Sequence, residues 1–232
     1  MNNIIDIYNI LLKIYGFQYW WPIVIDGKSR YLEEFSKRER TSEEIFEICI
    51  GAILTQNTAW KNVEKALINL KTKTNLDIKK IQNLDMTTLA ELIKPSGYFN
   101  QKSKKIKAFL NFINDELKGD IIKIKNYTTE KARNILLSVW GIGRETADSI
   151  LLYAYDKPIF VTDAYTRRIF SRVSLIKGEL EYDLIQKMFH ENLPQDSNIY
   201  KEYHALIVAF AKDTCKKEPS CDKCCIRNLC NI

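Results

Sequence analysis

The chain has 232 residues, of which 46% are hydrophobic and 28% charged, a balance typical of a globular protein with a substantial buried core. Its formal net charge is +6, which favours a polyanionic partner without identifying one. Uncharged apolar runs of about eighteen residues are missing and the start of the chain does not look like a secretory signal, so we expect a cytoplasmic protein without a membrane span.

Apolar residues recur at three- and four-residue intervals through most of the chain, the spacing of helices with one buried face. The first such segment runs from Ile4 to Ile14, and a capping box formed by Thr41 and Glu44 opens the next. Further amphipathic segments follow at 61–71, 87–94, 102–117, 129–138, 144–155, 163–172, 182–192 and 200–212. Convincing alternation of the β type is missing, so the sequence predicts an all-α fold.

Two glycines, Gly141 and Gly143, lie between the helical segments that end near Ser138 and start near Arg144. Such a turn needs glycine for its positive φ and for close approach of its backbone to another group. The helix start also presents backbone N–H groups and the positive end of its dipole, which suit a phosphate. The flanking pattern favours a phosphate-binding hairpin over the alternative, an ordinary turn between two helices.

An acidic residue, Asp163, follows the apolar run 160–162 and precedes the helical segment that starts at Ala164. It could cap that helix or act as a general base that faces a cleft. On the residues alone the cap is favoured. The two roles are compatible, because a cap holds the carboxylate in place.

Five of the six cysteines lie within the last eighteen residues, unlike the scattered disulfides of secreted proteins. Four of them follow the pattern Cys215-x5-Cys221-x2-Cys224-x5-Cys230, which offers four thiolates to a [4Fe–4S] cluster or to zinc. Zinc sites usually contain two Cys-x2-Cys pairs, and this segment has one. The spacing therefore favours the cluster, with Cys225 outside the four-ligand pattern.

Together the glycine hairpin, the aspartate and the cysteine pattern resemble the helix-hairpin-helix DNA glycosylases typified by endonuclease III. Residues 97–104 also resemble the Gly-Tyr-x-x-x-Lys turn of that family. The resemblance implies two helical domains that flank a DNA-binding cleft. Residues 39–156 would form a six-helix barrel with the hairpin, and residues 1–38 with 157–232 would form the cluster domain. We expect a monomer that acts on double-stranded DNA containing a damaged base.

The sequence departs from endonuclease III in ways that affect the predicted chemistry. Glu145 stands where that family carries its catalytic lysine, two residues after the second hairpin glycine. Strand cleavage through a Schiff base needs an amine nucleophile, so Glu145 at this catalytic position favours a monofunctional enzyme. The first cysteine gap is also five residues rather than six, and Cys225 is extra.

The segment Tyr19-Trp20-Trp21-Pro22, with Phe46 and residues 50–58, resembles the third class of bacterial 3-methyladenine DNA glycosylases, which also carry glutamate at the position of Glu145. From composition alone, paired tryptophans belong more often to a core than to a site. The resemblance implies instead that these aromatic rings stack on an extruded, cationic base. Lys212 is predicted to reach the same pocket.

The resemblance also assigns the remaining roles. Asp163 would stabilise the oxocarbenium-like sugar, orient the attacking water, or both. Gln56 or Asn57 would fill the gap left in the duplex. The hairpin would grip the phosphate backbone through Gly141, Gly143 and Arg144. A second backbone contact would come from Lys102 and Lys104 with Lys105 and Lys107, for which a solvated helix face is an equally good explanation.

The sequence therefore predicts a base excision repair enzyme that hydrolyses the N-glycosidic bond of a flipped, damaged base, with alkylated purines as the preferred substrates. Two other hypotheses remain. One is a bifunctional endonuclease III-type glycosylase and lyase that acts on oxidised pyrimidines, against which Glu145 weighs. The other is a non-catalytic iron–sulfur DNA-binding protein, against which Asp163 weighs.

Overall fold

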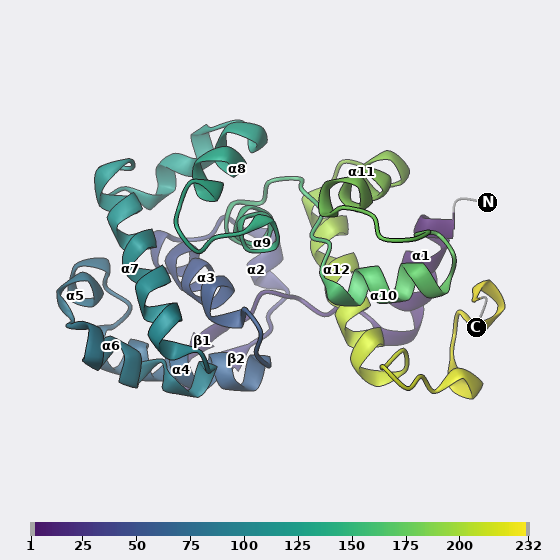
Figure 1. Ribbon diagram of the computed structural model, residues 1–232, viewed down its shortest axis with the longest axis horizontal. Helices are drawn as coiled ribbons and strands as arrows, with labels where there is room; N and C mark the ends of the chain where they lie inside the picture. Colours follow the sequence, from purple (N-terminus) through teal and green to yellow (C-terminus); the bar gives the residue numbers. More distant parts are fainter. Residues whose placement is uncertain (1–2, 231–232) are drawn as a thin grey trace. The chain divides into compact units, whose positions relative to one another are not determined.

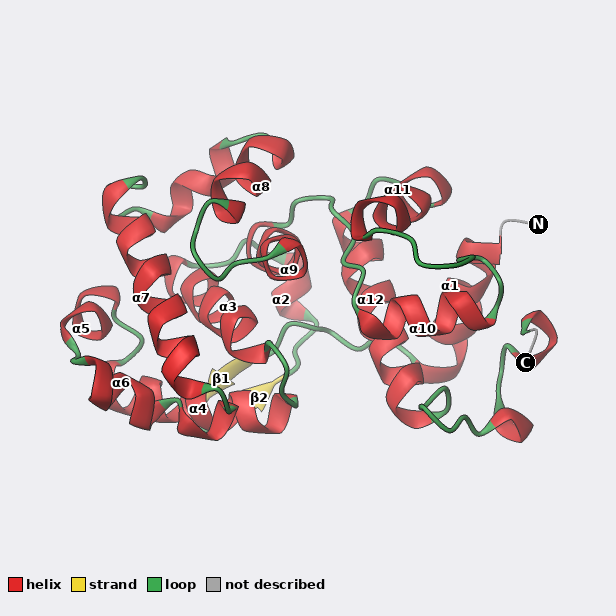
Figure 2. Cartoon of the chain, viewed as in Figure 1, coloured by secondary structure: helices red, strands yellow, loops and turns green. Residues whose placement is uncertain are grey.

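The computed structural model describes residues 3–230, and within this range helices and loops account for everything except one short hairpin of strands (Figure 1, Figure 2). The all-α prediction is confirmed. The chain divides into two compact units. Residues 21–155 form the central unit, and the residues on either side, up to Trp20 and from Asp156 onward, form the terminal unit. None of the described helices combines the length and the apolar composition needed to cross a membrane.

The central unit is built around α3 (Ser42–Thr55), whose residues 45–54 are all buried. A helix that is apolar on every side requires neighbours on every side. The helix packs against α4 (Trp60–Thr74), α7 (Phe99–Asp115) and α9 (Arg144–Tyr155), between which Figure 1 shows it. The remaining elements are α2 (Glu34–Lys37), α5 (Ile78–Asn83), α6 (Met86–Leu92), the 3-10 helices η1 (Lys94–Ser96) and η2 (Ile121–Asn126), and α8 (Thr129–Leu137).

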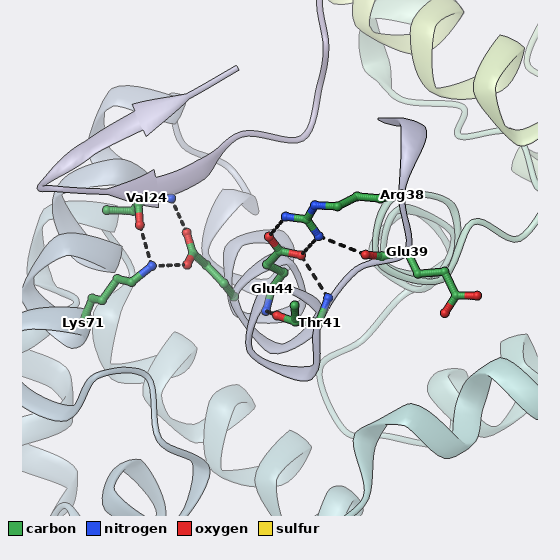
Figure 3. Close-up of polar contacts among 7 residues, drawn as sticks. Val24, Arg38, Glu39, Thr41, Glu44 and Lys71 are labelled. Atoms are coloured by element: carbon green, nitrogen blue, oxygen red, sulfur yellow. Dashed lines mark hydrogen bonds and ion pairs between the residues drawn. The ribbon is translucent and has the colours of Figure 1, made fainter. Parts of the chain in front are cut away.

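The predicted capping box at the start of α3 is present (Figure 3). Thr41 Oγ1 accepts a hydrogen bond from Glu44 N at 3.3 Å, and Glu44 Oε2 accepts one from Thr41 N at 2.9 Å. Arg38 Nη1 donates to the same carboxylate oxygen at 2.9 Å. This pairing satisfies two backbone donors that a helix start would otherwise leave without partners.

A buried carboxylate ties the β-hairpin, β1 (Ile23–Ile25) with β2 (Lys28–Arg30), to the central unit. Glu47 on α3 is 2% exposed, accepts a hydrogen bond from Val24 N at 2.5 Å, and accepts another from Lys71 Nζ at 2.7 Å. Lys71 also donates to Val24 O (Figure 3). These contacts explain why residues 21–38 pack with the central unit, whereas the sequence placed them with the cysteine-bearing half.

In the terminal unit, α1 (Asn3–Tyr15) packs against α12 (Ser197–Asp213), and Tyr203 Oη donates to Ile4 O at 2.7 Å. An aromatic cluster fills the interior, with Phe160 and Phe189 stacked at 4.0 Å between ring centroids. The other elements of this unit are α10 (Ala164–Arg172), α11 (Tyr182–Asn192), η3 (Cys221–Lys223) and η4 (Arg227–Leu229).

Candidate functional site

The predicted hairpin joins α8 to α9 in the central unit, and an ion pair fixes the two helices against each other. Arg133 on α8 binds Asp148 on α9 in a bidentate manner, with Nε–Oδ1 at 2.7 Å and Nη2–Oδ2 at 3.1 Å. The Asp148 side chain is fully buried, so the pair is screened little by solvent. The ion pair therefore holds together the two helices that the turn connects.

The two hairpin glycines serve different purposes. Gly141 has a φ of +86°, a conformation that L side chains rarely adopt. Gly143 is not among the residues with positive φ, and a Cβ there would meet nothing within 4 Å. Its carbonyl accepts a hydrogen bond from Ala147 N at 2.9 Å, which makes Gly143 the cap of α9. Space is therefore open beside Gly143 at the start of α9, where the backbone N–H groups of a first helical turn can bind a phosphate.

Gln56 and Asn57, predicted to fill the gap in the duplex, have different surroundings. Gln56 is half-buried, and its Nε2 donates to Gly141 O at 3.2 Å and to Thr146 Oγ1 at 2.9 Å. Its Oε1 accepts a hydrogen bond from Lys105 Nζ. Asn57 is exposed, with a left-handed backbone at φ +55°. Gln56 thus contacts the hairpin directly, and Asn57 is the exposed residue that follows it.

Three of the four predicted basic residues on α7 point inward, which corrects the prediction for Lys102. Lys102 is 2% exposed, and its Nζ donates to Leu54 O at 2.8 Å and Ser96 O at 2.7 Å. Burial lowers the pKa of Lys102 to about 8, and the charge of Lys105 lowers it in the same sense. Lys107 donates in the same way to three carbonyls at the end of α5. These amines satisfy the last carbonyls of neighbouring helices, and Lys104 is the exposed member of the group.

Asp163 caps α10 in the terminal unit, as the sequence alone favoured. Its Oδ1 accepts hydrogen bonds from Thr166 N at 2.7 Å and from Thr166 Oγ1 at 2.9 Å. His204 on α12 places Nε2 at 3.7 Å from Oδ2, which is longer than a hydrogen bond and within the range of an ion pair if the imidazole is protonated. Burial by itself would raise the pKa of Asp163, but His204 and Thr166 outweigh it, and the pKa lies below its ordinary value.

His204 escaped the sequence analysis because it lies 41 positions from Asp163 on another helix. The feature of the sequence that could have pointed to His204 is that the chain contains just two histidines. The other, His190, accepts a hydrogen bond from Phe160 N at 2.9 Å through Nε2. That contact makes His190 a structural residue and leaves His204 as the histidine that faces the candidate carboxylate.

The four cysteines of the predicted ligand pattern line one hollow in the terminal unit, of about 260 Å³ with open solvent included. Cys225 is not part of its lining. Burial raises the pKa of the Cys224 thiol, and the thiols of Cys215, Cys230 and Cys221 raise it further. Among residues 3–230, no three cysteine, histidine or acidic side chains close on a single point as the ligands of one metal ion would.

An arginine at the end of α10 anchors the cysteine segment. Arg172 Nη1 donates to Cys215 Sγ at 3.2 Å and to Lys216 O at 2.6 Å, and Nη2 donates to Lys217 O at 2.8 Å. Its backbone carbonyl lies 3.5 Å from Cys230 Sγ. Four thiols around a common hollow, with a cation beside one sulfur, fit a [4Fe–4S] cluster, because such clusters take thiolate ligands and accept hydrogen bonds at sulfur.

Residues 50–195 match the HhH-GPD superfamily of base excision DNA repair proteins. The chain belongs to this superfamily. It is 46% identical to a Methanocaldococcus jannaschii protein named "Putative DNA repair glycosylase", over 98% of this chain and 95% of that protein. It is also 30% identical to an endonuclease III of Sulfolobus acidocaldarius, over 80% of this chain and 81% of that protein. The resemblance found in the sequence is confirmed, and the protein is a DNA N-glycosylase.

Solved structures agree with this assignment at the level of the fold. A non-covalent complex of endonuclease III with DNA matches the glycosylase with a TM-score of 0.79 at 18% identity, over 99% of this chain and 94% of that one. An H. pylori 3-methyladenine DNA glycosylase bound to 1,N6-ethenoadenine matches with a TM-score of 0.68 at 27% identity, over 90% of this chain and 97% of that one.

The predicted base-pocket residues of the glycosylase are distributed over both units. Trp21 is 3% exposed and packs against Trp60 and Tyr153, at 5.3 and 5.4 Å between ring centroids. A Cβ on Gly51 would lie 3.0 Å from the Trp21 ring, so the ring packs closely against the backbone of α3 at that position. Phe46 is 1% exposed in the same unit. Trp21 and Phe46 are both buried within the central unit, and their role in a base pocket stays a prediction.

The remaining predicted residues lie nearer the surface. Trp20 is half-buried and Lys212 is exposed in the last turn of α12, both in the terminal unit. Arg144 and Glu145 are exposed in the first turn of α9 in the central unit. Arg144 therefore lies at the predicted phosphate site beside Gly143, and Glu145 contributes a carboxylate to the same turn. The role of each as a pocket or catalytic residue stays a prediction.

Proposed function

We propose that the glycosylase is monofunctional and hydrolyses the N-glycosidic bond of a flipped, damaged base with Asp163 as its catalytic carboxylate. The observation that carries the proposal is the environment of Asp163. Its Oδ1 is held by Thr166, its Oδ2 faces His204 at 3.7 Å, and its pKa is below the ordinary value although the group is buried. A carboxylate held in this way stays ionised at neutral pH in a fixed orientation.

This environment indicates which kind of catalysis Asp163 contributes. As the bond between C1′ and the base nitrogen breaks, its electron pair leaves with the base and positive charge develops on the sugar. A carboxylate with a lowered pKa is a weak base but a permanent negative charge, so it acts mainly by stabilising that sugar. Water then adds to C1′ and releases its proton to the surrounding solvent, which completes the hydrolysis without a covalent intermediate on the protein.

The properties of two side chains, Glu145 and Lys102, support the assignment of a monofunctional enzyme. Glu145 in the first turn of α9 offers a carboxylate, which cannot form a Schiff base. The amine of Lys102 has a lowered pKa of about 8, which is favourable for a nucleophile. It is nevertheless buried and donates to two backbone carbonyls, so it is held in a structural role.

Double-stranded DNA is the proposed partner of the hairpin in a monomeric, cytoplasmic enzyme. The open side of Gly143, the start of α9 and the exposed Arg144 together suit a phosphate of the backbone. Asn57 is exposed and follows Gln56, which contacts the hairpin, so it is suited to occupy the space that an extruded base leaves. Lys104 adds a second, purely electrostatic contact.

Alkylated purines are the proposed substrates, and the similarity to the H. pylori 3-methyladenine glycosylase supports them. A cationic alkylpurine is already a good leaving group, so its release needs no further protonation by the enzyme. The second candidate is the release of oxidised pyrimidines, which the similarity to proteins named endonuclease III favours.

A [4Fe–4S] cluster is the proposed cofactor, and the residues that would hold it are Cys215, Cys221, Cys224 and Cys230. When bound, it supplies a redox-active group and a rigid cross-link of the C-terminal segment. Hydrolysis of the glycosidic bond exchanges no electrons, so the proposed contribution of these cysteines to base release is structural.

The test is base release from duplexes that carry 3-methyladenine, thymine glycol or 8-oxoguanine, each with and without later treatment with alkali. The proposal expects 3-methyladenine to be released fastest and strand breaks to appear only after alkali. Asp163→Asn should reduce release on the order of 100-fold or more, with binding to damaged DNA retained. Trapping of the protein on DNA by borohydride would overturn the monofunctional assignment, and full turnover by Asp163→Asn would make Asp163 a helix cap only.

A further inference from the structure

One side chain, Gln56, connects three segments of the central unit at the hairpin. Its Nε2 reaches Gly141 in the turn and Thr146 in the first turn of α9, and its Oε1 accepts from Lys105 on α7. Both ends of the amide are therefore in use. The end of α3, the middle of α7 and the hairpin are joined by a single group.

Lys105 also touches the hairpin through its aliphatic stem. A Cβ built on Gly141 would overlap Cγ of Lys105 and lie 2.9 Å from its Cδ and 3.1 Å from its Cε. Gly141 is thus required for its positive φ and, independently, because the lysine stem occupies the space of a side chain. Contact with a methylene stem is the ordinary way in which a half-buried lysine contributes to packing.

The amine of Lys105 decides how the Gln56 amide is oriented. A glutamine amide has a donor end and an acceptor end of nearly the same shape. With a cationic donor at Oε1, the NH₂ group must face Gly141 O, which is an acceptor. If the lysine were lost, the amide could turn over and place an oxygen against the Gly141 carbonyl, which would repel it.

We propose that Lys105 is a positioning residue for DNA binding, which fixes the hairpin through Gln56 and Gly141 and does not itself contact a phosphate. The inference rests on the proposed phosphate-binding role of the hairpin. The lysines of α7 then fall into two groups, those that bind acceptors within the protein and one that is exposed. The amines of three lysines donate to acceptors of this chain, namely those of Lys102, Lys105 and Lys107. The Lys104 side chain is exposed and could meet a polyanion.

The salt dependence of binding separates these roles, because each phosphate contact adds about 0.9 to the slope of log K against log salt. Lys105→Met keeps the stem and removes the donor, and Lys104→Met makes the same change at an exposed neighbour. Affinity for a duplex with a tetrahydrofuran abasic site is measured by fluorescence anisotropy over a range of salt concentrations. Lys105→Met should bind about tenfold more weakly with an unchanged slope. Lys104→Met should lower the slope.

Two further variants make the outcomes distinguishable. Lys105→Arg restores a cationic donor and should bind close to the wild type, which shows that the donor matters rather than the bulk of the side chain. Gly143→Asp tests the hairpin alone, and unfolding midpoints confirm that each variant is folded. If Gly143→Asp binds normally, the phosphate-binding role is wrong. Two results would show that Lys105 is not a positioning residue, provided that Gly143→Asp binds weakly. In the first, Lys105→Met binds DNA as tightly as the wild type. In the second, the slope of log K against log salt for Lys105→Met is smaller in magnitude by about 0.9.

Discussion

His204 Nε2 lies 3.7 Å from Oδ2 of Asp163, and this pair joins α12 to the start of α10 inside the terminal unit. Three other charged side chains of these two helices have different partners. Lys201 pairs with Asp156, Glu202 accepts from Gln18 N, and Arg168 donates to backbone carbonyls of Ala211 and Cys215. His204 is therefore the side chain of α12 that faces the candidate catalytic carboxylate.

Loss of His204 should move the acid limit of base release to higher pH. The pKa of Asp163 is held below its ordinary value partly by His204, so removal of the histidine raises it. Because the carboxylate must be ionised to act, activity is then lost at a higher pH as the solution is acidified. His204→Gln is compared with the wild type in single-turnover rates over a pH series. His190→Gln, which removes a structural histidine, is the control. An unchanged acid limb in His204→Gln would show that Thr166 alone sets this pKa.

Lys102 should make stability depend on pH in the alkaline range. Its folded pKa is about 8, below the ordinary value of 10.5, so the unfolded chain binds more protons between these values. The penalty for burying the charge is fully present below pH 8 and disappears as the pH rises toward 10.5. The free energy of unfolding, measured with urea, should therefore rise with pH in the wild type relative to Lys102→Met. Lys104→Met is the matched control. A parallel course for wild type and Lys102→Met would contradict the lowered pKa.

Trp21→Ala should destabilise the central unit by about 3–5 kcal/mol, the cost of emptying a large buried aromatic site. The ring is 3% exposed and touches Trp60, Tyr153 and Gly51. Urea unfolding measures the loss, and Trp20→Ala, at a half-buried neighbour, should cost less. If Trp21→Ala is as stable as the wild type and yet fails to release 3-methyladenine, the ring acts as a pocket wall rather than as core.

Replacement of single cysteines should distinguish the cysteines that bind the cluster from Cys225, which is not expected to bind it. Protein purified without oxygen should contain about four irons per chain. Cys221→Ser and Cys224→Ser should lose iron and visible absorbance, because both thiols line the hollow. Cys225→Ser, the control next in sequence, should keep both. Zinc in place of iron in protein never exposed to air would reject the cluster, and iron loss in Cys225→Ser would show that the ligand pattern is misassigned.

Features encoded by neighbouring residues could be predicted from the sequence. The capping box of Thr41 and Glu44, the helical character of the chain, the turn at Gly141 and the helix cap at Asp163 each depend on a few consecutive residues. Backbone conformation and the first hydrogen bonds of a helix are local properties. The superfamily followed from the combination of such motifs, because their order and spacing along the chain are specific even where each motif is not.

The tertiary structure alone decided what each helix face meets. Periodicity placed Lys102, Lys105 and Lys107 on one amphipathic segment, but their partners are the ends of α3 and α5 and Gln56. His204 contacts Asp163 from another helix. Glu47 accepts a hydrogen bond from Val24 N, which attaches the β-hairpin to the central unit. A long amine can equally well face solvent or a buried carbonyl, and the choice depends on whether another helix ends within its reach. That distance is fixed only when the helices have packed.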